Sequence, residues 1–108
     1  MRAQSTIAAG ICGFTTQVAA EADDNMQVTL QITTPCPRIR SLSENLGKDG
    51  PLDALNELTP GASRILGDAT SQGICLGCVV PCGIFKTMQV AANLSLPANV
   101  QMTITGEG

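Results

Sequence analysis

Apolar and polar side chains alternate in three segments of the N-terminal third of the chain. These segments are residues 6–11, 15–22 and 27–33. Such alternation is typical of a strand with one buried face. Gly13 lies in the first connection and Asp23-Asp24-Asn25 in the second, and both suit tight turns. The pattern predicts three strands joined as an antiparallel meander.

In the middle of the chain, apolar residues recur every three or four positions, which predicts helices. We expect one helix from Pro37 to Gly47, a short one over 51–58, one beginning at Thr59-Pro60 and one beginning at Cys82-Gly83. Proline near the start of a helix and glycine at its C-terminal end are common boundary signals. The helices offer apolar stripes that can cover the buried face of the sheet.

Alternation returns near the C-terminus, where Val100, Met102 and Ile104 are separated by polar residues. This segment predicts a fourth strand. A long helical crossover before it favours a parallel return beside the first strand, in the order 4-1-2-3. The expected fold is α+β: a four-stranded mixed sheet, made of a three-stranded antiparallel meander plus the C-terminal strand, with helices on one face. We expect one such domain over residues 1–108, whose other face, rich in Thr and Gln, is hydrated or covered by a partner.

Composition narrows the functional classes. The chain carries six basic and nine acidic residues and has a net charge of −3, so no basic patch favours nucleic acid. Its apolar runs are too short for a membrane span, and residues 1–5 are not followed by the apolar core of a signal peptide. We therefore expect a cytoplasmic protein, with a protein partner or a homo-oligomer left open. Histidine is absent, which removes imidazole as a base or a metal ligand.

Cysteine is the residue type that suggests chemistry. Cys75, Cys78 and Cys82 have the spacing C-x2-C-x3-C, and the only other cysteines are Cys12 and Cys36. Cys12 follows the first predicted strand, Cys36 follows the third, and Cys82 opens the last helix, so all should lie at one edge of the sheet. If Cys12, Cys36 and Cys78 share one ion, their sulfurs should lie within about 4 Å of one another, given zinc–sulfur bonds of about 2.3 Å. Cys82, whose thiolate a helix N-terminus would favour, is the expected fourth ligand, and Cys75 the most expendable.

Three interpretations of the cysteines remain open. The first is a metal carrier or accessory domain that binds zinc or an iron–sulfur cluster, although the spacing matches no diagnostic motif. The second is thiol–disulfide redox chemistry through Cys75 and Cys78. The third is a structural interaction module with buried cysteines and no metal. Arg38 and Arg40 either flank an anion near Cys36 or lie on an exposed helix surface. Whether the protein is an enzyme stays undecided.

Four short motifs also resemble a small family of functionally uncharacterised single-domain proteins. They are Ile11-Cys12-Gly13-Phe14, Cys36-Pro37, Cys78-Val79-Val80-Pro81 and Ala91-Ala92-Asn93-Leu94-Ser95-Leu96-Pro97. The resemblance covers almost the whole chain. It implies that Cys12, Cys36 and Cys78 match the family pattern, whereas Cys75 and Cys82 are additions. It implies no activity, so the functional case depends on the residues themselves.

Overall fold

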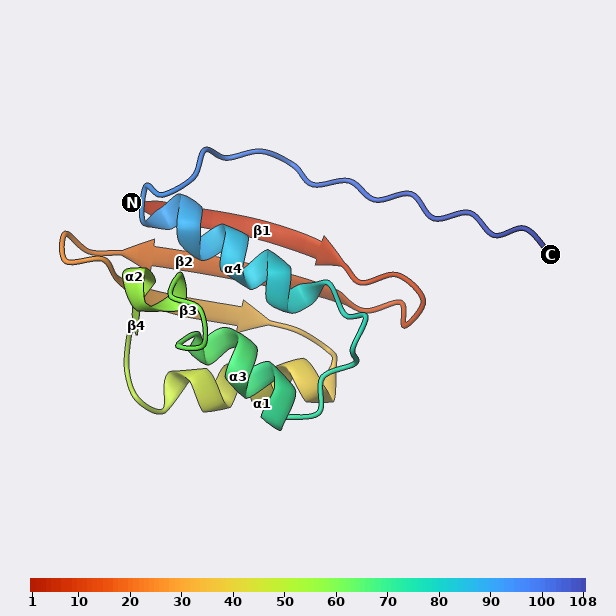
Figure 1. Cartoon of the computed structure of the whole chain (residues 1–108), viewed down its shortest axis with the longest axis horizontal. Coiled ribbons are helices and arrows are strands. Elements are labelled where there is room, and N and C mark those ends of the chain that lie inside the picture. The colour runs from red at the N-terminus through yellow and green to blue at the C-terminus, as the bar shows by residue number, and fades with distance from the viewer.

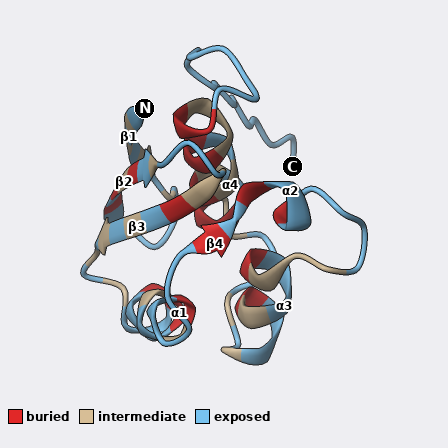
Figure 2. Ribbon diagram, turned by 90° about the vertical axis from the view of Figure 1, so that its left-hand side faces the viewer, coloured by how far each residue is buried: buried red, intermediate tan, exposed pale blue.

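A computed structural model describes residues 1–108 and arranges them as an antiparallel sheet with helices on one side (Figures 1 and 2). The elements are β1 (Arg2–Ala8), β2 (Thr15–Ala22), β3 (Gln27–Thr33), α1 (Pro37–Gly47), β4 (Leu52–Asp53), α2 (Ala54–Glu57), α3 (Arg64–Ser71) and α4 (Val80–Ala91). The strand order is β1-β2-β3-β4. The α+β class and the position of the helices on one side are therefore confirmed.

The predicted meander is present. β2 has the predicted bounds, and its inward side chains, such as Val18 and Ala20, are buried. β1 is longer than predicted at its N-terminal end, because an edge strand can pair through its backbone without apolar side chains at every second position. It also ends earlier, so Ile11 lies on the β1–β2 hairpin, fully exposed, and not on the strand. Gly10 and Gly13 have positive φ angles, which close this hairpin.

The core lies between the sheet and the helices. α4 covers β1 and β2, while α1 packs against β3 and α3 (Figure 2). The largest hydrophobic side chains that are fully buried come from both layers: Val18, Val28, Ile39, Leu42, Ile65, Val80, Ile84 and Met88. They are aliphatic or methionine, as the near absence of aromatic residues requires. None of the helices is long and apolar enough to cross a bilayer.

Three predicted helix boundaries were wrong. α3 begins at Arg64, not at Thr59-Pro60. Gly61 has a φ of 81°, which a right-handed helix cannot include, and Ser63 then caps the helix. The predicted helix over 51–58 is divided into β4 and α2, since the Asp53 carboxylate accepts the N–H groups of Leu55 and Asn56 and starts the helix there. α4 starts at Val80, two residues before the predicted position.

The predicted C-terminal strand is also wrong. Residues 99–108 have no strand partner and are exposed, so the mixed sheet of order 4-1-2-3 does not form. The fourth strand is instead the two-residue β4, which pairs antiparallel with β3. In Figure 1 the helices lie in front of the sheet, so a return from β3 through α4 to a parallel strand beyond β1 would be a left-handed crossover. Such connections are right-handed in about 98% of cases. The hand of the connection thus opposes the predicted pairing.

Candidate functional site

All five cysteines belong to segments at one end of the sheet. Cys12 lies on the β1–β2 hairpin, Cys36 is the N-cap of α1, Cys75 and Cys78 lie in the loop before α4, and Cys82 lies in its first turn. β1 and β3 both run toward this end because each pairs antiparallel with β2 (Figure 1). The prediction that the segments carrying the cysteines lie at one edge of the sheet is confirmed for the segments themselves.

The five thiols are free, and they differ in exposure. Cys12, Cys75 and Cys82 are exposed, whereas Cys36 and Cys78 are half-buried and pack against the hydrophobic core. Cys78 leads directly into the buried start of α4, which explains why its side chain is partly covered. The site therefore combines two anchored thiols with three that solvent can reach.

The cysteines do not form a ready-made metal centre. No three Cys, Asp or Glu side chains are grouped so that they could hold one metal ion. The sulfurs of Cys12, Cys36 and Cys78 thus do not meet at the distance expected for a shared ion. Cys36 and Cys78 are held by the core, while Cys12 stands on a hairpin that extends past the start of α4 (Figure 1). Whether these residues bind a metal stays a prediction.

The structure gives Cys75 and Cys78 a specific local geometry. The N–H of Cys78 donates a hydrogen bond to the carbonyl of Cys75 over 2.9 Å, which closes a turn through Leu76 and Gly77. In such a turn the first and fourth Cα atoms lie less than about 7 Å apart. A disulfide requires Cα atoms about 4.4–6.8 Å apart. The two cysteines are therefore within reach of a mutual disulfide without a large backbone movement.

An arginine from another element contacts the exposed thiol of this turn. The Arg38 guanidinium donates a hydrogen bond from Nη1 to Sγ of Cys75 over 3.3 Å. Arg38 lies in the first turn of α1, where helical side chains tilt toward the N-terminus and so toward the neighbouring loop. The sequence left two interpretations of Arg38 and Arg40 open, an anion near Cys36 or an exposed helix surface, and both residues are exposed. The structure places Arg38 on Cys75 instead, while Arg40 donates to the Thr34 carbonyl.

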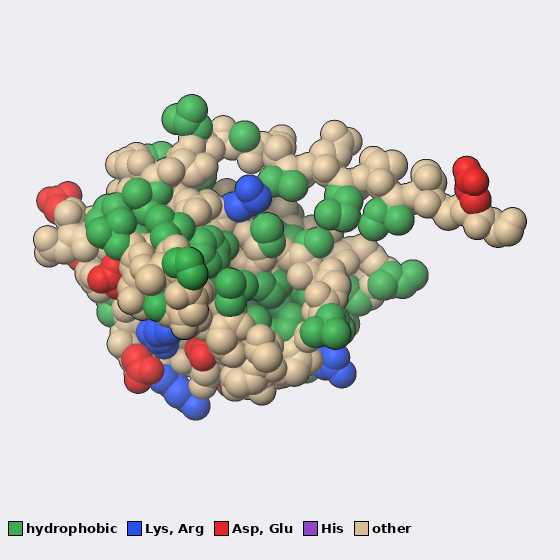
Figure 3. Space-filling view, in the orientation of Figure 1, with side chains coloured by type: hydrophobic (Ala, Val, Ile, Leu, Met, Phe, Trp, Pro, Cys, Tyr) green, Lys and Arg blue, Asp and Glu red, His purple; other side chains and the backbone are tan.

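Acidic side chains lie away from the end of the fold that carries the cysteines. On the face shown in Figure 3, Asp and Glu side chains gather at the opposite end of the body and on the C-terminal segment. Asp23 and Asp24, for example, lie in the β2–β3 turn, at the far end of the sheet from the cysteines. Arg38 thus contacts Cys75 at an end of the fold where few acidic groups lie.

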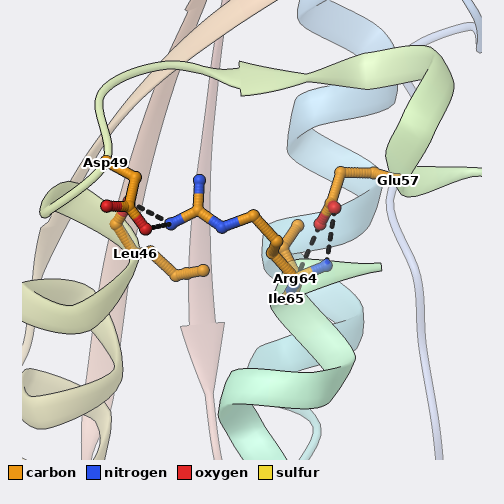
Figure 4. Close-up of polar contacts among 5 residues, drawn as sticks. All are labelled: Leu46, Asp49, Glu57, Arg64 and Ile65. Carbon is orange, nitrogen blue, oxygen red and sulfur yellow. Dashed lines mark hydrogen bonds and ion pairs between the residues drawn. The ribbon is translucent and has the colours of Figure 1, made fainter. Parts of the chain in front are cut away.

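The chain also holds one buried carboxylate, which the sequence did not reveal. Glu57 is 2% exposed, and its oxygens accept the N–H of Arg64 at 2.6 Å and the N–H of Ile65 at 2.8 Å (Figure 4). The Ser63 hydroxyl also donates to this carboxylate, over 3.3 Å. Arg64 in turn forms an ion pair with Asp49. The carboxylate is fully used in capping α3, so its role is structural. Glu57 lies seven residues before α3, too far for a local capping motif to indicate it.

Comparison with known proteins adds a family but no activity. The model of a protein family described as "Family of unknown function (DUF6951)" matches residues 3–104. Neither the curated proteins nor the solved structures gave a match. The matched range includes all five cysteines and most of the extended C-terminal segment. The resemblance to an uncharacterised family, drawn from the short motifs, is confirmed.

Proposed function

The chain belongs to the family of unknown function DUF6951, and we propose that it exchanges disulfides with partner molecules through Cys75 and Cys78. One observation carries this proposal: the two cysteines share a hydrogen-bonded turn, and Arg38 donates to the sulfur of the exposed one. Two thiols are enough for this chemistry, so no further side chain has to move into place. The pair comes before α4 and not inside it, so the positive group beside the exposed sulfur is the Arg38 side chain and not a helix N-terminus.

The difference in exposure assigns a role to each sulfur. Cys75 is exposed and would attack one sulfur of a partner disulfide as the thiolate, the nucleophilic form of cysteine. The S–S bond of the partner breaks, and a mixed disulfide forms between the partner and Cys75. The other partner sulfur leaves as a thiolate and takes a proton from solvent.

Cys78 completes the exchange. It is half-buried beside the core, which limits its contact with large external disulfides. Its thiolate attacks the Cys75 sulfur, the mixed disulfide breaks, and the second partner sulfur leaves and is protonated. The partner has been reduced by two electrons and the Cys75–Cys78 pair oxidised by two. A dithiol partner reverses the same steps and restores the free thiols.

Trapping of the mixed disulfide tests this function. The reduced protein is mixed with a disulfide-bonded peptide, and its mass is followed. Cys78→Ser should accumulate a peptide adduct on Cys75, because the resolving thiol is missing, whereas Cys75→Ser should not. The unmodified protein should gain an internal disulfide, and Cys82→Ser, the matched control, should behave in the same way. Adducts spread equally over Cys12, Cys75 and Cys82 would reject the proposal.

A second candidate is thiolate binding of zinc or an iron–sulfur cluster, as in a carrier or accessory domain. The observation that favours it is the gathering of five free thiols from three segments at one end of the fold. Cys36 and Cys78 would supply fixed ligands, and Cys12 and Cys82 would complete the set after the β1–β2 hairpin moves. Thiolates are the ligands that zinc and iron–sulfur clusters share.

Metal analysis separates the two candidates. The protein is purified without oxygen, and zinc, iron and sulfide are measured. Metal binding predicts near-stoichiometric metal that Cys36→Ser or Cys78→Ser removes and Cys75→Ser largely keeps. Disulfide exchange predicts that activity is lost in Cys75→Ser and in Cys78→Ser and is kept in Cys36→Ser. Both functions need reduced cysteines, which favours the cytoplasm as the compartment.

A further inference from the structure

The C-terminal segment has the pattern of a strand but no partner. Val100, Met102 and Ile104 are 68%, 68% and 83% exposed, and each is followed by a polar residue. No charged residue lies between Asn93 and Gly106. A water-facing loop is normally polar or charged, whereas this alternation suits a strand with one buried face. The apolar side chains of this segment therefore have no protein surface to pack against.

The end of α4 directs this segment along the sheet. Asn93 has a φ of 61°, its N–H donates to Val90, and the N–H of Leu94 donates to Gln89 over 2.8 Å. These bonds form a Schellman motif, which ends a helix and turns the chain. Beyond Pro97 the chain runs in the same direction as β1 and continues past the end of the sheet (Figure 1).

β1 offers a free edge of the matching kind. Its only neighbour is β2. The bonds from Ala9 to Phe14 and from Ala22 to Met1 show that odd-numbered residues of β1 pair with β2, so the N–H and C=O groups of Gln4 and Thr6 point away from the sheet. Residues 3–8 contain no charge and no proline, the usual protections of an edge strand.

The helix layer above this edge presents two half-exposed apolar side chains. Thr87 and Gly83 of α4 contact β1, through the Ser5 hydroxyl and the Ile7 side chain respectively. Val79 and Val90 lie three or four positions from them, on the same side of the helix, and remain half-exposed. A strand added beside β1 could pack its apolar face against these valines and continue the Thr/Gln surface with its other face.

The same chain cannot easily supply that strand. Pairing with its own β1 would require the left-handed crossover described above, whereas a strand from another molecule has no such connection. We propose that residues 98–105 of one copy pair with the β1 edge of a second copy. The reciprocal exchange gives a closed two-fold dimer, in which both exposed segments and both free edges are covered.

Two substitutions on the β1 edge and two on the C-terminal segment test this exchange of strands. The molecular mass of each variant is measured by light scattering over a concentration series. Reductant is kept present, so that exposed cysteines do not cross-link. The unmodified chain should have the mass of a dimer. Thr6→Pro removes the outward N–H and should give a monomer, while Thr6→Val keeps that N–H and the dimer. Met102→Asp should likewise give a monomer, whereas Thr103→Asp, on the hydrated face, should not.

Circular dichroism confirms that each variant is folded before its mass is interpreted. Three results would overturn the proposal. One is a monomeric unmodified chain at every concentration. Another is protection of the 99–105 amides from hydrogen exchange in a monomer, which would mean pairing with the chain's own β1. The third is a dimer that persists in both Thr6→Pro and Met102→Asp, which would assign the contact to another surface.

Discussion

The Glu57 carboxylate accepts the backbone N–H of Ile65 over 2.8 Å, and both residues are buried. A second oxygen of the same carboxylate accepts the N–H of Arg64. One side chain thus satisfies two of the first N–H groups of α3, which have no partner inside the helix. It also fixes α2 against α3. This contact holds the two short helices that follow β4 in place.

We expect Glu57→Gln to destabilise the fold by about 1–3 kcal/mol, because one side-chain oxygen is replaced by an amide group that cannot accept the Arg64 or Ile65 N–H. Glu57→Ala should cost at least as much. The free energy of unfolding, measured by urea denaturation, checks both. Glu44→Gln on the exposed side of α1 is the matched control and should change stability by less than about 0.5 kcal/mol. Equal stability of the Glu57 and Glu44 variants would show that the buried cap is not needed.

A second prediction concerns the close approach of α4 to β1. A Cβ atom added at Gly83 would lie 2.9 Å from Cγ1 of Ile7, and Cδ1 would be nearer still. Gly83→Ala should therefore destabilise the protein by about 1–3 kcal/mol through overpacking. Ile7→Ala in the same chain should make the glycine substitution much less costly.

Gly67 provides the control for this effect. It lies in α3 with open space around its Cα and a φ that is not positive. Gly67→Ala should stabilise the helix by up to about 1 kcal/mol, since alanine has the higher helix propensity. Thermal unfolding of both variants measures the contrast. A stabilising Gly83→Ala would show that Ile7 gives way without cost.

The third prediction tests the contact between Arg38 and Cys75. Arg38→Gln removes the positive donor from the sulfur, so alkylation of Cys75 near neutral pH should slow several-fold. The rate is measured by mass spectrometry of the peptide that contains Cys75. Arg40→Gln is the matched control, because Arg40 lies on the same helix and does not contact the cysteine. Equal rates in the two variants would remove Arg38 from the proposed site.

The fourth prediction concerns Asn93, the residue that ends α4. Its φ of 61° lies in the left-handed region, which asparagine and glycine tolerate better than other residues. Asn93→Ala should lower the free energy of unfolding by about 1 kcal/mol, and Asn93→Gly should leave it equal or higher. Urea denaturation of the two variants side by side gives the result. An Asn93→Ala protein as stable as the glycine variant would mean that the chain leaves the helix in another way.

Local pattern was enough to predict much of this fold. Alternation located β2 and β3, and the apolar spacing of Ile39, Leu42 and Leu46 located α1, because a half-buried strand and an amphipathic helix are each set by which side chains must leave water. The alternating direction of the strands also predicted that Cys12 and Cys36 lie at the same end of the sheet. Those features depend on neighbours in the sequence or on the order of elements.

Tertiary structure decided the rest. Residues 100–104 have the pattern of a strand but do not join their own sheet, and the hand of the connection through α4 opposes that pairing. Glu57 reaches α3 only because two helices fold together. The hairpin that carries Cys12 points past the core that holds Cys36 and Cys78, and Arg38 meets Cys75 across 37 residues of chain. The sequence determined which side chains of β2, β3 and α1 are buried and which thiols share an end of the sheet, since alternation and helical spacing mark the buried face of each element. The distance between two sulfurs, or between a guanidinium and a sulfur, depends on how separate segments pack, and only the folded chain decides it.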